Sequence, residues 1–551
     1  MKRRNFIKNL SSLAGAAPFV LNGLPMQAFA ANSELQRAAA NSTNDRVIVL
    51  IQLHGGNDGL NTIIPINQYS EYYNLRANIA IPESGNRKMI QLDSFLPDEQ
   101  QVGLHPDMQD FKWLYDQGKA AVVQNVAYEN INGSHFRSRD IWFMGGDYDD
   151  HYGSGWIGRY LNHYDPAYPE GYPSEQNPDP LALEIGNDMS LAFHRDSGIP
   201  VSISINNPEQ FYNLITNVGG APPESVKDTF YGHELQWIMD LEEKSNQYAG
   251  RLKELFDKGR NSSTVYPERY PLSAPDGDVR NPLSAQLRMI ARLLSGGAQT
   301  KIFLAKIGGF DTHANQVEDY DATMGGHAAK LYHITSAVRA FQDDLKALGL
   351  EDKVLTVTFS EFGRRAISNG SYGTDHGKAA PMMIFGKNVH PGVVGNTPDL
   401  KNLDRGDIRY EIDYRQVFTT LLEDWMGATP EAIQDTRFED FSDKKLPLIA
   451  GSSTVTSIKD DFINERYRLD NCYPNPARNK TIFSYRINAN MHVSLNLYDM
   501  NGQLVKRIVD EVQKPGTYQY PVTLYNVPAG TYIYRIEAGL LKAAKRLIIA
   551  K

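Results

Sequence analysis

Four short polar motifs contain residue types suited to metal binding or ester hydrolysis. They are His54–Thr62 (HGGNDGLNT), Gly133–Asp140 (GSHFRSRD), Gly308–His313 (GGFDTH), and a motif in two parts, Ser360–Arg364 (SEFGR) with Gly373–Gly377 (GTDHG). Carboxylates and imidazoles are common ligands of divalent cations. Taken alone, each motif has an ordinary structural interpretation as a glycine-rich turn, a helix cap or a surface ion pair. An Asp-x-His pair is weak evidence by itself.

Ser134 has a second possible role besides capping a helix. It precedes a segment that we expect to be helical, and unpaired backbone N–H groups at a helix start favour negative charge. A hydroxyl in that position is well placed to attack an anionic ester. Arg137 and Arg139 follow it and are suited either to clamping oxyanions or to forming surface ion pairs.

The elements that must position these motifs are five predicted strands. Each is a near-continuous apolar run, as expected of strands buried on both faces of a parallel sheet. In open parallel sheets ligands bind where the strands end, and the four motifs follow or separate strand candidates. Their shared position favours a metal site. The strands are Arg46–Leu53, Ala120–Val126, Lys301–Ile307, Val354–Phe359 and Pro381–Phe385.

Predicted helices alternate with these strands. Apolar residues recur at steps of three and four from Leu331 to Leu348, which predicts a helix that covers the sheet. Asp413 is a good N-cap for another helix ending near Gly427, and Thr229–Lys258 also has a helical pattern. The sequence therefore predicts one α/β domain over residues 31–449, with a mostly parallel sheet flanked by helices.

Composition limits the classes of function. A net charge of −9 over 551 residues argues against a nucleic-acid binder, which needs a basic face. The single cysteine, Cys472, cannot form an intramolecular disulfide. No long apolar stretch follows the first thirty residues, so we expect no transmembrane segment in the mature form.

The first thirty residues have the features of an export signal. Lys2-Arg3-Arg4 precedes an apolar run from Leu10 to Leu24, and Ala28-Phe29-Ala30 is a small-x-small cleavage site. We expect cleavage after Ala30. The segment Arg3–Lys8 resembles a twin-arginine signal, with a general secretory signal as the alternative. Either route predicts a protein that reaches the periplasm.

The C-terminal region changes to short alternating strands. We expect a linker over residues 450–468, followed by a small antiparallel sandwich over 469–551. Tight turns such as Met500-Asn501-Gly502 separate its strands. Three motifs and a basic terminal strand resemble a type IX secretion (Por) sorting domain: Tyr473–Pro476 (YPNP), Tyr498–Gly502 (YDMNG) and Pro528–Tyr532 (PAGTY). The resemblance implies that the type IX machinery recognises residues 469–551 and delivers the protein to the cell surface or the medium.

The four polar motifs, taken in order, resemble the domain of unknown function 1501 family. That family is grouped with the alkaline phosphatase-like superfamily, which includes sulfatases and phosphomutases with a hydroxyl nucleophile and one or two metal ions. The resemblance implies an alkaline phosphatase-like fold. It also implies that Ser134 is the nucleophile and that Asp58, Asp311, His313 and His376 are metal ligands.

Three further residues complete the expected site. The Thr374-Asp375-His376 stretch is similar to one in phosphomutase relatives, so Asp375 joins His376 among the metal candidates. Glu361 stands where the superfamily usually has an Asp-His pair, a departure that puts a second metal site in doubt. Arg364 or Arg137 is expected to bind a non-bridging oxygen of the substrate.

These observations predict a secreted, metal-dependent hydrolase of phosphate or sulfate esters. The expected substrate is a small molecule or a glycan ester, and the expected cofactor is a divalent cation, with Zn, Mn, Mg and Ca all left open. The alternative is a non-catalytic cell-surface binding protein that retains the phosphatase-like fold. No nucleic-acid partner is expected.

Overall fold

The computed structural model describes residues 17–21, 24–28, 44–455 and 466–550, apart from gaps at 170–171, 176, 187–188, 206–247, 249, 489 and 540. A short antiparallel hairpin, β1 (Ala17–Leu21) with β2 (Leu24–Ala28), precedes the main domain. The predicted cleavage site at Ala30, the twin-arginine segment and most of the predicted 229–258 helix lie outside the described residues. The described part of that last segment, 250–258, is helical.

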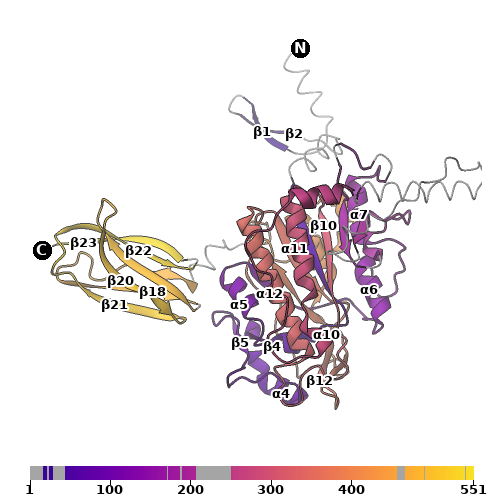
Figure 1. The fold of residues 1–551 in the computed structure, drawn as a ribbon, viewed down its shortest axis with the longest axis horizontal. Coiled ribbons are helices and arrows are strands. Elements are labelled where there is room, and N and C mark those ends of the chain that lie inside the picture. The colour runs from indigo at the N-terminus through magenta and orange to yellow at the C-terminus, as the bar shows by residue number, and fades with distance from the viewer. Residues whose placement is uncertain are drawn as a thin grey trace, which may run out of the picture.

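The main domain is built on one twisted sheet with helices on both faces (Figure 1). Its strand order is β15-β7-β14-β11-β3-β10-β8-β9, with β16 added beside β7. β14 pairs antiparallel with both neighbours, and the other described pairings in this sheet are parallel. The predicted mostly parallel sheet is therefore confirmed. The strands are β3 (Val47–Leu53), β7 (Ala120–Ala127), β8 (Ala182–Ile185), β9 (Ser202–Ile205), β10 (Ile302–Ile307), β11 (Val354–Phe359), β14 (Ala380–Phe385), β15 (Gly392–Val394) and β16 (Ile412–Asp413).

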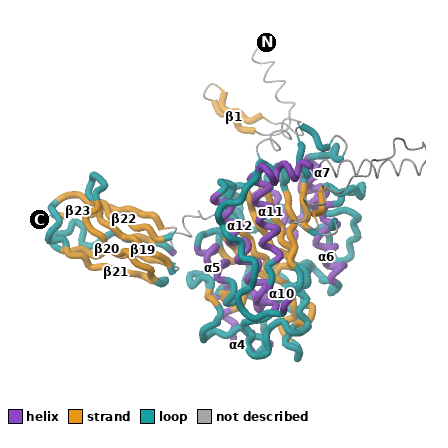
Figure 2. Tube along the Cα trace, viewed as in Figure 1, coloured by secondary structure: helices purple, strands orange, loops and turns teal. Residues whose placement is uncertain are grey.

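Two hydrophobic layers enclose the sheet, because its central strands are mostly apolar and are buried at every position. In β3, Val49 and Ile51 pack into one layer, while Ile48 and Leu50 pack into the other. Helices α5 (Gln109–Asp116), α11 (Pro282–Ser295) and α12 (Gly326–Ala347) contribute to the first layer. The second includes side chains from α6 (His135–Met144), α7 (Trp156–Tyr164), α13 (Tyr414–Thr420) and α14 (Pro430–Thr436). Figure 2 shows the helices around the strands.

Helix α13 begins as the sequence predicts. Asp413 is its N-cap and forms a capping box with Gln416. The chain continues as a π-helical turn over Leu421–Trp425. Shorter elements complete the domain: α3 (Gly59–Thr62), α4 (Tyr69–Arg76), α10 (Asp276–Val279), the three-stranded sheet of β4 (Ile63–Pro65), β5 (Ile90–Gln91) and β6 (Val102–Leu104), and the hairpin of β12 (Arg364–Ser368) with β13 (Thr374–His376).

The C-terminal unit is an all-β structure of two antiparallel sheets. One has the order β17-β18-β21 and the other β20-β19-β22-β23, and their alternating inward side chains form a separate core. The small antiparallel sandwich that the sequence predicts is therefore present. The strands are β17 (Arg468–Leu469), β18 (Lys480–Ile487), β19 (Met491–Tyr498), β20 (Leu504–Gln513), β21 (Gly516–Thr523), β22 (Gly530–Ala538) and β23 (Leu541–Ile549). Among the described residues, no helix is long and apolar enough to cross a membrane.

Candidate metal centre

The carboxyl ends of four parallel strands meet at one edge of the sheet. His54 directly follows β3, Asp311 lies four residues after β10, Glu361 lies two residues after β11, and the chain leaving β7 leads to Ser134 and α6. The β12–β13 hairpin brings His376 to the same place. This convergence is the one expected at the ligand-binding edge of an open α/β sheet.

Glycine is required at position 55 for this edge to close. Gly55 has φ of +125°, and a β-carbon there would lie 2.3 Å from the backbone nitrogen of Asp311. The backbone of Phe310 also donates to the carbonyl of His54 at 3.1 Å. The glycine-rich turn therefore lets the loop after β3 pack directly against the loop that carries Asp311.

Three imidazoles surround the carboxylate of Asp311. Their Nε2 atoms lie 3.4 Å (His135), 3.1 Å (His313) and 3.3 Å (His376) from its oxygens. Nε2 of His313 lies 2.9 Å from Nε2 of His376. Ligand atoms of His135, Asp311 and His376 all lie within 4.8 Å of one another, close enough to hold one cation. His313 borders this group.

Each imidazole is held through its other ring nitrogen. Nδ1 of His135 donates to Glu361 at 2.9 Å, Nδ1 of His313 to Asp375 at 3.2 Å, and Nδ1 of His376 to the carbonyl of Gly133 at 2.8 Å. A proton on Nδ1 leaves the Nε2 lone pair of each neutral ring directed at the cluster. Nε2 of His135 is buried and makes no hydrogen bond within the described structure.

The charges of the cluster follow from its surroundings. Burial raises the pKa of Asp311, but the hydrogen bond and charge of Arg364, together with His376, outweigh it and bring the pKa to about 2. Burial lowers the pKa of His376. The hydrogen bond that His135 donates to Glu361 raises the pKa of His135 despite the opposing effect of burial. At neutral pH the cluster thus offers a carboxylate and at least one neutral imidazole.

Glu361 lies behind the cluster and not within its ring of ligand atoms. Its buried carboxylate accepts from the backbone of Gly55 at 2.8 Å and from His135. Asp375 has the matching place behind His313. Both residues were expected among the metal ligands, and the structure places each of them where it orients an imidazole.

Asp58 is not among the residues that the structure brings together at the cluster. Its carboxylate is fully buried in an ion pair with Arg76, 2.7 Å away, and it also accepts from Gln316 at 2.6 Å. Burial raises the pKa of Asp58, but the charge of Arg76, together with His327 and Gln316, outweighs burial and leaves this pKa below its ordinary value. Arg76 in turn donates to the carbonyls of Arg365 and Ala366. This pair fixes the start of the β12–β13 hairpin.

The two arginines expected to bind substrate oxygens are bound to the protein itself. Arg364 is fully buried and donates to Asp311 at 2.6 Å and to backbone carbonyls that include those of Gly56 and Thr374. Arg137 donates to the carbonyls of Tyr148 and Asp150. Both hold loops around the cluster in place.

Ser134 occupies the N-cap position of α6, as predicted, but its side chain makes no capping hydrogen bond. The residue is exposed, and its neighbour Gly133 accepts from His376. The residue therefore follows a backbone group that contacts the cluster, and its hydroxyl has no intrahelical partner.

His135 is the cluster member that sequence reasoning missed. It stands directly after Ser134 in the GSHFRSRD motif, and its place at the start of a helix was the available signal. His54 is a second unpredicted histidine at this edge, with its ring stacked 6.2 Å from that of His135.

Two family models match the chain and confirm the two resemblances. Residues 233–436 match the family described as "Protein of unknown function (DUF1501)". This range contains the motifs of Asp311, Glu361 and His376, while the motifs of His54 and Ser134 precede it. Residues 471–550 match "Secretion system C-terminal sorting domain", which indicates secretion to the cell surface or the medium. No curated protein matches the chain.

Solved structures that match the chain include proteins described as sulfatases and one described as belonging to the alkaline phosphatase superfamily. The PsFucS1 sulfatase from Pseudoalteromonas sp. has a TM-score of 0.30 at 11% identity, covering 90% of this chain and 89% of that one. A protein in the alkaline phosphatase superfamily from Vibrio parahaemolyticus has a TM-score of 0.29 at 11% identity, covering 89% and 88%. A sulfatase described as putative, from Bacteroides fragilis, has a TM-score of 0.29 at 9% identity, covering 85% and 88%. Because these TM-scores and identities are low, the role of the site is argued from its own geometry.

Proposed function

We propose that this protein is a secreted, metal-dependent hydrolase of phosphate or sulfate esters. The observation that carries the proposal is the convergence of three imidazole Nε2 atoms on the carboxylate of Asp311, with each Nδ1 already occupied. Such an arrangement leaves lone pairs facing one another, which is unfavourable unless a proton or a cation lies between them. The donor set therefore fits a metal ion.

The ligand chemistry narrows the choice of metal that the sequence left open. Mg²⁺ and Ca²⁺ prefer oxygen ligands, whereas imidazole suits Zn²⁺ and other transition metals. Residues His135, Asp311 and His376 would hold the ion, with His313 beside them. When bound, it would supply a Lewis acid that lowers the pKa of a nearby hydroxyl and neutralises charge on the transferring group.

Ser134 is our candidate nucleophile. Its oxygen would attack phosphorus or sulfur and displace the alcohol of the ester, which takes up a proton as it leaves. Water would then cleave the seryl ester and release phosphate or sulfate. The unpaired N–H groups at the start of α6 would stabilise the negative charge of the ester. Glu361, Asp375, Arg137 and Arg364 are positioning residues in this scheme.

One observation favours the alternative of a surface binding protein. Glu361 lies behind His135, and Asp58 is locked to Arg76, so the expected ligands of a second metal are engaged elsewhere. A single metal centre also suits a site that captures an anionic ligand without cleaving it.

Hydrolysis of aryl phosphate and aryl sulfate by the purified protein separates the two functions. We expect release of the aryl alcohol from at least one ester, a loss of at least 100-fold in Ser134→Ala, and a comparable loss in His376→Ala. Ser484→Ala, which changes a serine in β18 of the C-terminal sandwich, is the matched control and should retain full activity. Unchanged activity in both site variants would overturn the proposed site, and metal binding without any turnover would favour the binding protein.

A further inference from the structure

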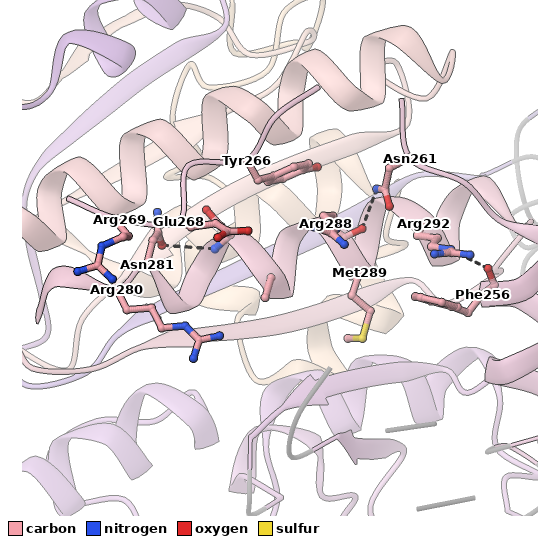
Figure 3. A pocket seen from close by; sticks show the side chains of 12 residues that line it. Phe256, Asn261, Tyr266, Glu268, Arg269, Arg280, Asn281, Arg288, Met289 and Arg292 are labelled. Carbon is pink, nitrogen blue, oxygen red and sulfur yellow. Dashed lines mark hydrogen bonds between the residues drawn. The ribbon is translucent and has the colours of Figure 1, made fainter. Parts of the chain in front are cut away.

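A basic groove lies along the outer face of α11, separate from the metal cluster. Two adjoining cavities of about 460 and 360 Å³ form it. They share Asn261, Arg288 and Arg292, so they are two parts of one depression between α11 and the strap of residues 259–269. Figure 3 shows the larger cavity and the side chains that line it.

The lining of this groove carries a strong positive charge in a protein whose net charge is −9. Its charged residues are one glutamate, Glu268, and five arginines: Arg260, Arg269, Arg280, Arg288 and Arg292. Within the described chain, the side chains of Arg269 and Arg288 are exposed and enter no recorded ion pair or hydrogen bond. Guanidinium groups bind sulfate, phosphate and carboxylate through paired hydrogen bonds.

The walls of the groove are fixed before any ligand arrives. Asn261 donates to the carbonyl of Arg288 at 2.9 Å and to Asp344 at 2.8 Å. Ser284 donates to the carbonyl of Pro267 at 2.5 Å. Arg292 lies over the ring of Phe256, with its guanidinium carbon 3.6 Å from the ring centre. A preorganised surface loses little entropy on binding.

The spacing of the arginines favours an extended ligand. Arg280 precedes α11 and Arg292 lies in its last turn, so at 1.5 Å per residue they are spread over roughly 18 Å. A single phosphate or sulfate ion cannot contact both ends. Ala285 and Met289 lie between the charges and provide apolar surface. The groove thus suits a chain that alternates anionic groups with less polar faces.

One end of the groove lies on the same edge of the sheet as the metal cluster. Helix α11 precedes β10 and runs back along it, so the N-terminal end of α11 faces the carboxyl end of β10. Asp278, two residues before Arg280, pairs with Lys330 at 2.7 Å, and Lys330 lies against Gly309 in the loop that leads to Asp311. A chain bound along α11 is therefore directed toward that loop.

We propose that this groove binds a linear anionic polysaccharide bearing sulfate or carboxylate groups. The acidic net charge and the presence of Glu268 disfavour nucleic acid, whose dense phosphates require a uniformly basic face. The inference does not depend on hydrolysis, because the groove is tested by binding alone.

Affinity measured by calorimetry on the full-length protein tests the groove. The probes are heparin as a sulfated chain, neutral dextran of similar length, and a 20-nucleotide single-stranded DNA. We expect binding to heparin, none to dextran, and weaker binding to DNA. Arg269→Ala combined with Arg288→Ala should weaken heparin binding by at least about ten-fold, because two charge-assisted contacts are lost.

A control variant loses the same number of positive charges outside the groove. Lys480→Ala combined with Lys542→Ala removes two exposed cations from β18 and β23 of the sandwich and should leave the affinity within about two-fold. Equal affinity in the groove variant and the wild type would overturn the proposal, as would absence of heparin binding. Tighter binding of DNA than of heparin would overturn the assignment to a polysaccharide.

Discussion

Glu361 and His135 show how a buried carboxylate prepares an imidazole for metal binding. Glu361 raises the pKa of His135 through their hydrogen bond, so His135 holds its proton to a higher pH than usual. A metal must displace that proton, and metal affinity should therefore fall as the pH drops through this raised pKa. In Glu361→Gln the pKa of His135 falls, so the loss of affinity should begin at a lower pH.

Competition with a chelating dye from about pH 5 to 8 measures this effect. The midpoint of the pH dependence is the informative quantity, because loss of an orienting carboxylate also weakens binding about 10- to 100-fold at every pH. An identical midpoint in the wild type and Glu361→Gln would contradict the role given to Glu361.

Asp58 and Arg76 have a structural role that predicts a different response. Arg76→Met leaves the buried carboxylate of Asp58 without its partner, which should reduce the free energy of unfolding by about 3–5 kcal/mol. Urea unfolding followed by tryptophan fluorescence measures the change. Lys401→Met removes one member of an exposed ion pair with Glu71 and should leave the free energy of unfolding nearly unchanged, because solvent screens such a pair. Equal stability of the two variants would contradict this assignment.

Single residues were harder to predict than the site as a whole. The motifs correctly indicated one edge of the sheet, because glycine, carboxylate and imidazole follow buried strands there. Asp58 belongs to the same motif as His54, and only the fold shows that Arg76, eighteen positions later, lies against it. Glu361 and His135 are 226 positions apart, so the sequence gives no sign that one orients the other.

Among the elements, the central strands were predictable because both of their faces are buried. Val47–Leu53 and Val354–Phe359 are buried at every position. Strands toward the two sides of the sheet were missed, because β8 and β9 contain polar residues such as Glu184 and Ser202, and β15 has only three residues. Antiparallel β14 has no sequence mark that distinguishes it from its parallel neighbours.

Helix α5 ends in a carboxylate that should make stability depend on pH. Burial raises the pKa of Asp116 to about 6 against the attraction of Lys112, and a negative charge at a helix C-terminus is unfavourable. The folded state then holds this proton more tightly than the unfolded state, whose pKa is near 3.8. The contribution of this proton to the stability of the folded state is fully present below the pKa of the unfolded state, near 3.8, and is lost as the pH rises to about 6.

Asp116→Asn should remove this part of the pH dependence. Compared with the wild type, the variant should lose less stability between about pH 4 and pH 7, by at most about 3 kcal/mol, because the Lys112 ion pair is lost as well. Thermal unfolding at a series of pH values measures the difference. The exposed Asp443, changed to Asn, is the control. The same pH profile in Asp116→Asn and Asp443→Asn would contradict the effect.

In the whole molecule, the main domain and the C-terminal sandwich have separate hydrophobic cores, and we expect them to have different roles. The sandwich has its own hydrophobic core and matches the sorting family. Removing residues 471–551 should therefore leave the main domain folded while abolishing its delivery to the cell surface. Protease accessibility on intact cells measures delivery, and the circular dichroism of the purified truncated protein measures folding. Surface delivery without the sandwich would contradict this division.

The proposed metal centre consists of His135, Asp311 and His376 around one transition-metal ion. Elemental analysis of the purified full-length protein, after incubation with Zn²⁺ and removal of free metal, tests it most directly. We predict about one equivalent of bound metal in the wild type, and nearly none in a variant carrying both His135→Ala and His376→Ala. His163→Ala, a histidine paired with Asp435 away from the cluster, should retain the wild-type amount. Equal metal content in the double variant and the wild type, or none in either, would show that these residues do not form a metal centre.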